Sequence, residues 1–129
     1  MPTDQIIIFV CEHGAAKSVI AATYFNRLAK ERNLGTHAIA RGTNPESELS
    51  PKTVSGLQND GLTPTESVPQ KLSPTEAGSA EKLVTFCELP NEYSHKTIEH
   101  WDNIPPVSED YQKARDAIVE RLSEMMGSL

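Results

Sequence analysis

Hydrophobic residues come in short blocks whose period changes along the chain. Residues 5–10, Gln-Ile-Ile-Ile-Phe-Val, are a nearly continuous apolar run without alternation, which is typical of a strand buried on both faces of a parallel sheet. The apolar residues of the next stretch recur three and four positions apart, and Asn33-Leu34-Gly35 follows as a helix stop. We therefore predict a strand that ends at Val10 and a helix over about Lys17–Arg32.

The rest of the chain continues this alternation. His37–Arg41 and Lys82–Phe86 predict two more strands, and Lys96–Trp101 predicts a shorter fourth. Three further helices carry start signals, namely Ser50-Pro51, Ser73-Pro74 with Glu76 completing a capping box, and Ser108 followed by Glu109 and Asp110. The resulting order β-α-β-α-α-β-β-α favours an α/β fold with a doubly wound sheet.

Composition narrows the classes of function. The 129 residues suit one domain that spans 1–129. A formal net charge of -6 argues against nucleic acid as a partner, since nucleic-acid binding usually needs a basic surface. The N-terminal apolar run is too short for a signal sequence or a membrane span, so we expect a cytoplasmic protein without a membrane partner. Two cysteines do not make a secreted disulfide framework.

The segment Cys11–Ser18 lies between the first strand and the first helix, where open α/β sheets bind ligands. A helix N-terminus offers unpaired N–H groups, and the small residues Gly14, Ala15 and Ala16 let a backbone curl around an oxyanion. Such surroundings lower a cysteine pKa, and the thiolate is a nucleophile. The alternative is a buried cysteine beside an ordinary turn. No ATP-type P-loop motif is present.

This layout resembles the low-molecular-weight protein tyrosine phosphatases and the thioredoxin-coupled arsenate reductases that share their fold. The matching segments are Cys11–Ser18, Ala40-Arg41-Gly42-Thr43, Leu72-Ser73-Pro74, Val84-Thr85-Phe86-Cys87 and His100-Trp101 followed by Pro105-Pro106. The resemblance implies a three-layer sandwich around a four-stranded parallel sheet of order 2-1-3-4. It also implies a Cys11 nucleophile steadied by Ser18, and an oxyanion held by the loop residues Glu12, His13, Gly14, Ala15, Ala16, Lys17 and Ser18.

Two departures from the family bear on activity. Lys17 stands where the family has arginine, and a lysine lacks the planar fork that grips two oxygens at once. Pro105 stands where the family has the aspartate that protonates the leaving group. Asp102, three residues earlier, is the candidate replacement acid, and Glu109 and Asp110, a few residues later, are alternatives. We therefore expect low phosphatase activity. We expect Lys17 to reach a bound anion or to turn outward, and the Trp101 region to form a lid over the site.

Cys87 follows its strand as Cys11 follows the first, so both should emerge at one edge of the sheet. The resemblance favours a resolving role, because the arsenate reductases use a cysteine here; the alternative is a buried small hydrophobe. A third relay cysteine is missing, since Leu89, Pro90 and Asn91 occupy that region. The favoured hypothesis is arsenate reductase-like thiol chemistry with thioredoxin or a small thiol as reductant. A weak tyrosine phosphatase and a non-catalytic oxyanion-binding or regulatory protein remain open. The cysteine and histidine spacings fit no zinc pattern, so we expect no metal or cofactor.

Overall fold

The computed structural model describes residues 5–87, 89, 97–101 and 104–127. Its strands form one parallel sheet in the order β2-β1-β3-β4, as expected, and they are β1 (Gln5–Cys11), β2 (Thr36–Gly42), β3 (Lys82–Thr85) and β4 (Ile98–His100). The helices are α1 (Lys17–Glu31), α2 (Pro51–Asn59), α3 (Pro74–Ser79) and α4 (Tyr111–Met126). The predicted order of elements is confirmed.

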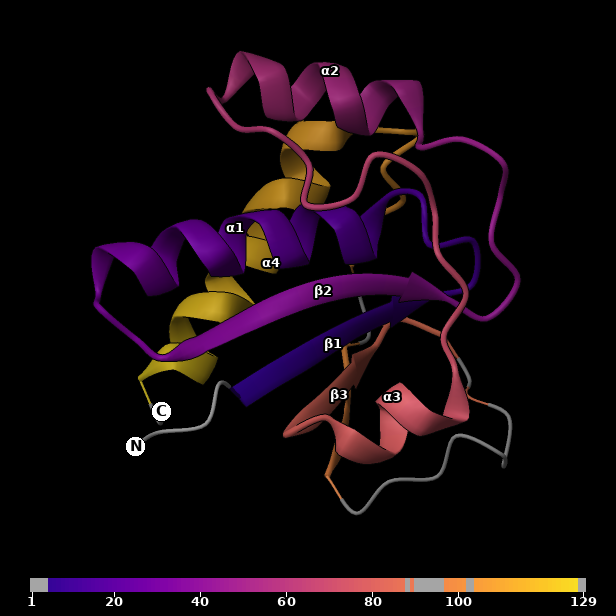
Figure 1. Cartoon of the computed structure of the whole chain (residues 1–129). Helices are drawn as coiled ribbons and strands as arrows, with labels where there is room; N and C mark the ends of the chain where they lie inside the picture. Colours follow the sequence, from indigo (N-terminus) through magenta and orange to yellow (C-terminus); the bar gives the residue numbers. More distant parts are fainter. Residues whose placement is uncertain (1–4, 88, 90–96, 102–103, 128–129) are drawn as a thin grey trace.

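Helices cover both faces of the sheet, with α1, α2 and α4 on one side and α3 on the other (Figure 1). Alternate residues of β1 point to the two sides, so Phe9 packs under α1 and α4 while Ile8 and Val10 pack under α3. All three are at most 1 % exposed. This double burial explains why the first strand reads as a continuous apolar run.

Capping side chains mark the starts of three helices. Ser50 accepts a hydrogen bond from the backbone N–H of Thr53, and Ser73 forms the predicted capping box with Glu76. The predicted cap of the last helix was wrong, because Asp110 and not Ser108 accepts from the N–H of Lys113. Residues 107–109 form a turn instead, in which the N–H groups of Glu109 and Asp110 both donate to the Pro106 carbonyl.

The predicted strand boundaries shift slightly. β2 gains one residue at each end because its pairing with β1 runs from Thr36 to Gly42. β3 ends at Thr85 and not at Phe86, because the Thr85 hydroxyl bonds to the backbone of Cys87 and turns the chain. β4 is shorter than predicted; of its predicted residues, Lys96 lies outside the described residues.

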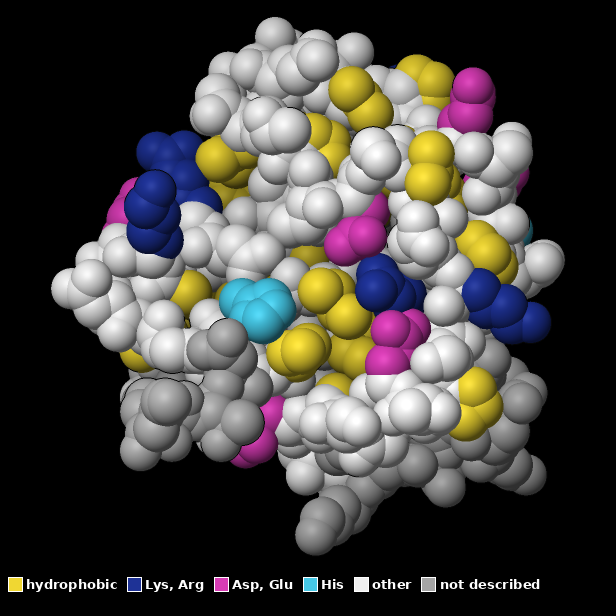
Figure 2. Space-filling view, in the orientation of Figure 1, with side chains coloured by type: hydrophobic (Ala, Val, Ile, Leu, Met, Phe, Trp, Pro, Cys, Tyr) yellow, Lys and Arg dark blue, Asp and Glu magenta, His cyan; other side chains and the backbone are white. Residues whose placement is uncertain are grey.

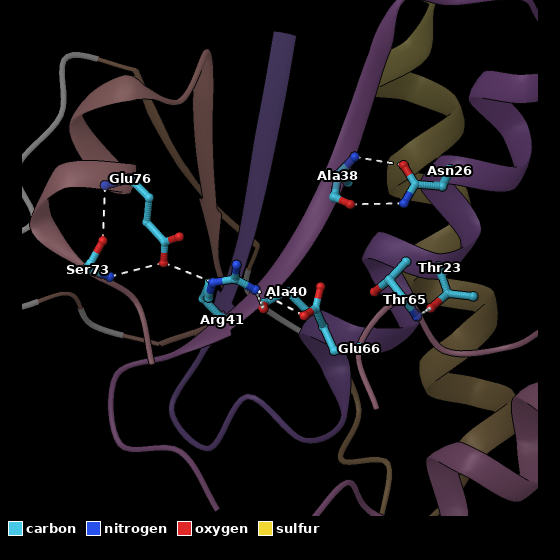
Figure 3. A network of polar contacts seen from close by, with 9 residues as sticks. All are labelled: Thr23, Asn26, Ala38, Ala40, Arg41, Thr65, Glu66, Ser73 and Glu76. Carbon is cyan, nitrogen blue, oxygen red and sulfur yellow. Dashed lines mark hydrogen bonds and ion pairs between the residues drawn. The ribbon is translucent and has the colours of Figure 1, made fainter. Parts of the chain in front are cut away.

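The outer edge of β2 is covered by other parts of the chain. The amide of Asn26 on α1 forms two hydrogen bonds with Ala38, donating to its carbonyl at 2.9 Å and accepting from its N–H at 2.7 Å (Figure 3). Further along, Gly42 donates to the Gln70 carbonyl and accepts from the Leu72 N–H. Both backbone groups of Ala38 and of Gly42 are therefore bonded.

Charged side chains of both signs are interspersed on the face shown in Figure 2, among the residues that the structure describes. None of the helices in the described ranges is long and apolar enough to span a membrane.

Candidate functional site

The loop between β1 and α1 is held in place by hydrogen bonds to its carbonyl oxygens. Residues 43–50 run beside it, and four of their N–H groups donate to loop carbonyls: Thr43 to Cys11 at 3.3 Å, Asn44 to Glu12 at 2.7 Å, Glu46 to His13 at 3.0 Å and Ser50 to Ala15 at 2.9 Å. By contrast, the backbone N–H groups of residues 12–18 donate no hydrogen bond to any other described residue. Four carbonyls at this loop are thus hydrogen-bonded, while its row of N–H groups has no acceptor among the described residues.

Two glycines bring the loop against the end of β2. Gly14 has a φ of 62°, in the left-handed region that favours glycine. A Cβ added to Gly14 would lie 2.9 Å from the Gly42 nitrogen, and one added to Gly42 would lie 2.7 Å from the Gly14 nitrogen. The two backbones are therefore in direct contact, and a side chain at either position would push the loop away.

The Cys11 thiol lies at the base of this loop and is partly exposed. Its Sγ is 2.9 Å from the Oγ of Ser18, which is fully buried at the start of α1. The thiol opens into a cavity of about 560 Å³, whose walls are the loop, residues 46–51 and residues 106–108. None of the described residues that line this cavity is Phe, Tyr or Trp.

Lys17 does not have a free ammonium. Its Nζ donates a 3.0 Å hydrogen bond to the carbonyl of Ile104, although the side chain also lines the cavity. The neighbouring Pro105 offers no proton, and Asp102, the candidate acid, lies outside the described residues. Asp110 is engaged as the cap of α4.

Cys87 follows β3, the strand that pairs with β1 through Val10 and Thr85. Its thiol is half-buried, and burial raises its pKa; a hydrogen bond with Thr85 opposes this rise, while the negative charge of the Cys11 thiolate adds to it. A Cys11 thiolate thus lies close enough to act on the pKa of Cys87, and the two thiols are not joined in a disulfide.

His13 projects from the loop among acceptors. Its Nδ1 lies 3.3 Å from the Asn44 carbonyl and 3.7 Å from the Glu46 carboxylate, and its Nε2 lies 3.9 Å from Glu12. The ring is half exposed, so these pairs are weak. In the described part of the chain, no three His, Cys, Asp or Glu side chains come together as metal ligands.

The sequence did not reveal that residues 44–50 hold the loop, nor that Trp101 is buried. Residues 44–50 act through backbone N–H groups, and no side-chain pattern signals that role. We expected the Trp101 region to form a lid over the site, but the indole is 2 % exposed and packs edge-on against Phe9 and Phe86 in the core. A large aromatic side chain suits burial in the core as well as it suits a lid over a site.

The sequence profile of the family described as low molecular weight phosphotyrosine protein phosphatase matches residues 6–129. The fold is similar to that of YfkJ from Bacillus subtilis, with a TM-score of 0.85 and 12 % identity over 98 % of this chain and 95 % of that one. It is also similar to an arsenate reductase from Archaeoglobus fulgidus (TM-score 0.75, 24 % identity, 94 % and 98 % covered). A third similar structure is the low molecular weight protein tyrosine phosphatase from T. tengcongensis, with a TM-score of 0.82 and 15 % identity over 97 % of this chain and 99 % of that one. No curated protein matches the sequence significantly.

Proposed function

The chain belongs to the low molecular weight phosphotyrosine protein phosphatase family, and from that premise we propose that Cys11 is the nucleophile of a thiol enzyme acting on phosphate- or arsenate-like oxyanions. The observation that carries the proposal is the loop at Cys11, four of whose carbonyls accept hydrogen bonds from residues 43–50 while the N–H groups of residues 12–18 find no acceptor in the described part of the chain. An oxyanion bound there would receive hydrogen bonds from donors that need no rearrangement.

Ser18 supports the thiolate in this proposal. Its hydroxyl, 2.9 Å from Sγ, donates to the sulfur once the thiol loses its proton. The N-terminus of α1 adds a partial positive charge at the same place. The thiolate is the reactive form of a cysteine.

The form of the reaction that fits best is reduction of arsenate by two cysteines. The Cys11 thiolate attacks arsenic and forms an S–As bond, and one arsenate oxygen leaves as water after protonation. The Cys87 thiolate then attacks the Cys11 sulfur, so the S–As electron pair stays on arsenic and arsenite leaves. Arsenic is reduced by two electrons, and the two cysteines become a disulfide, which a dithiol protein of the thioredoxin class or a small thiol reduces. A cytoplasmic location would supply such reductants.

Three features weigh against an efficient tyrosine phosphatase. Lys17 is hydrogen-bonded to Ile104, Pro105 replaces the acid that a leaving phenol needs, and no Phe, Tyr or Trp among the described lining residues could pack on a substrate ring. Arsenate reduction by a cysteine pair does not need an acid of that kind, and this difference favours the reductase reading.

The test measures arsenite formation from arsenate with thioredoxin, its reductase and NADPH, and separately with glutathione. We expect turnover in the wild type, none in Cys11→Ser, and a stalled first turnover in Cys87→Ser. Non-reducing mass spectrometry of the wild type after arsenate should show the loss of two hydrogen atoms that accompanies formation of a Cys11–Cys87 disulfide. A wild type that binds phosphate but never forms this disulfide would rule out the reductase.

The alternative functions make different predictions. A weak phosphatase would hydrolyse p-nitrophenyl phosphate slowly in a Cys11-dependent manner, and Lys17→Arg would raise the rate because arginine can grip two oxygens. An oxyanion-binding protein without catalysis would bind phosphate with no Cys11-dependent turnover of either substrate.

A further inference from the structure

We propose that Arg41 is a positioning residue for the oxyanion loop and that it acts through the backbone of Gly42. Arg41 is the last side chain before the glycine that contacts Gly14. The ligand-binding part of this inference rests on the proposed function, whereas its geometric part does not.

The Arg41 guanidinium joins three parts of the chain (Figure 3). Its Nε donates to a Glu76 carboxylate oxygen at 2.9 Å, and its Nη1 lies 3.3 Å from a Glu66 carboxylate oxygen and donates to the Ala40 carbonyl at 2.8 Å. The side chains of Arg41 and Glu66 are each 17 % exposed and that of Glu76 is 27 % exposed, so these pairs are largely shielded from water. The three contacts use two nitrogens of the planar guanidinium, and a lysine ammonium, whose donors all lie on one nitrogen, does not reproduce that spread.

These contacts hold the partners of Gly42 in place. Glu66 belongs to the segment that supplies the Gln70 carbonyl and the Leu72 N–H, which bond to Gly42 at 2.8 and 3.0 Å. Glu76 is on α3, directly after that segment, and also accepts from the Ser73 N–H in the capping box. Arg41 thereby ties both ends of the segment to the end of β2.

Gly42 passes this placement on to the loop. Its backbone is in direct contact with Gly14, and it is paired in the β1–β2 register with Cys11. Residues 43–50, which hold the loop carbonyls, continue directly from it. A displaced Gly42 would therefore move both the nucleophile and the free N–H groups of the loop.

The role of Arg41 is geometric and not electrostatic. Two carboxylates face its single positive charge, so the group as a whole is negative and does not attract an anion. Any loss of phosphate binding on removing Arg41 would have to come from a shifted loop.

The experiment compares Arg41→Met with Arg115→Met, which keep most of the side-chain volume. Arg115 is a matched control, because its Nη1 is 2.9 Å from Asp60 and its side chain is 23 % exposed. Inorganic phosphate affinity is measured by calorimetry in high salt, which screens long-range charge. The pH dependence of Cys11 alkylation, with Cys87→Ser as background, reports the thiol environment, and amide NMR reports Gly14 and Gly42.

We expect Arg41→Met to lose about tenfold or more in phosphate affinity and to shift the Cys11 alkylation profile. Arg115→Met should lose comparable thermal stability but keep phosphate affinity within about twofold. In Arg41→Met the Gly42 amide, bonded to Gln70, should exchange faster with solvent. Unchanged phosphate affinity and unchanged Gly14 and Gly42 resonances in a folded Arg41→Met protein would overturn the proposal, as would an equal loss of affinity in Arg115→Met.

Glu66→Gln covers the case in which Arg41→Met does not fold, since it removes one ion pair and should move the same signals by less. Failure of the proposed function looks different. A wild type that binds no phosphate refutes the oxyanion site, and the Gly14 and Gly42 resonances of the variants then decide the role of Arg41 alone.

Discussion

Replacing Gly42 by alanine would place a methyl group against the backbone of the oxyanion loop. The added Cβ would lie 2.7 Å from the Gly14 nitrogen, 2.9 Å from the His13 carbonyl carbon and 3.0 Å from the Gly14 Cα. All three neighbours are backbone atoms, so no side chain can rotate out of the way. The φ of Gly42 is not in the left-handed region, and the substitution therefore tests this contact and not backbone strain.

The size of the displacement follows from these distances. Ordinary contact begins at 3.4 Å, so the loop and β2 must separate by about 0.7 Å (3.4 minus 2.7) at Gly14. Overpacking of this kind costs about 1–3 kcal/mol of stability. Because a misplacement of about 1 Å at a reacting centre can cost about 100-fold, we expect a loss of about tenfold or more in phosphate affinity and in Cys11 reactivity.

The assay combines urea unfolding, phosphate calorimetry and the alkylation rate of Cys11. Gly35→Ala is the control, because a Cβ at Gly35 would meet nothing within 4 Å and the residue is exposed. We expect it to bind phosphate like the wild type. If Gly42→Ala also keeps wild-type stability, phosphate affinity and thiol reactivity, then the contact between Gly14 and Gly42 does not set the loop geometry.

Three further predictions concern packing and titration. Gly56→Ala should lose about 1–3 kcal/mol in urea unfolding because its Cβ would lie 2.4 Å from the Tyr111 ring, whereas Gly78→Ala, in open space, should gain about 0.5–1 kcal/mol; equal effects would contradict this. Burial acts to raise the Asp60 pKa, but hydrogen bonds from Tyr24 and Tyr111 and the charge of Arg115 outweigh it and hold that pKa below its ordinary value. Asp60 therefore stabilises the fold above its unfolded pKa, and the stability difference between wild type and Asp60→Asn should shrink as the pH falls to about 3; a constant difference would refute the linkage. Because burial raises the Cys87 pKa, iodoacetamide should modify Cys11 before Cys87 at neutral pH, and peptide mass mapping that finds Cys87 modified first would contradict the assignment.

Local sequence signals predicted the starts of helices correctly where a single capping residue determines the start. Ser50 and Ser73 each precede a proline, and each caps its helix as expected. At the last helix we predicted Ser108 as the cap, but Asp110, two residues later, caps it. The choice between them depends on the turn built on the Pro106 carbonyl, which no local propensity contains.

The sequence predicted the reactive side chains of the candidate site but not the backbone segment that holds the loop in place. Cys11 and Ser18 were identified from the sequence, and they lie 2.9 Å apart. The hydrogen bonds from residues 43–50 use main-chain N–H groups, which every residue except proline has, so their sequence carries no mark of this role. Lys17 was expected to reach a bound anion or turn outward, but it donates to Ile104, 87 positions away, and a contact at that separation cannot be inferred from either segment alone.

The two hydrogen bonds between the Asn26 amide and the Ala38 backbone affect how copies of this protein can associate. At this edge, a parallel or antiparallel strand from another molecule could extend the sheet only by using the outward N–H and C=O groups of β2. At Ala38 both are occupied by one side-chain amide, which imitates a neighbouring strand, and at Gly42 both are occupied by Gln70 and Leu72. A neighbour would have to break these bonds first, so edge-to-edge growth through β2 is blocked by the chain itself, and fibril-like stacking is disfavoured on this side of the sheet.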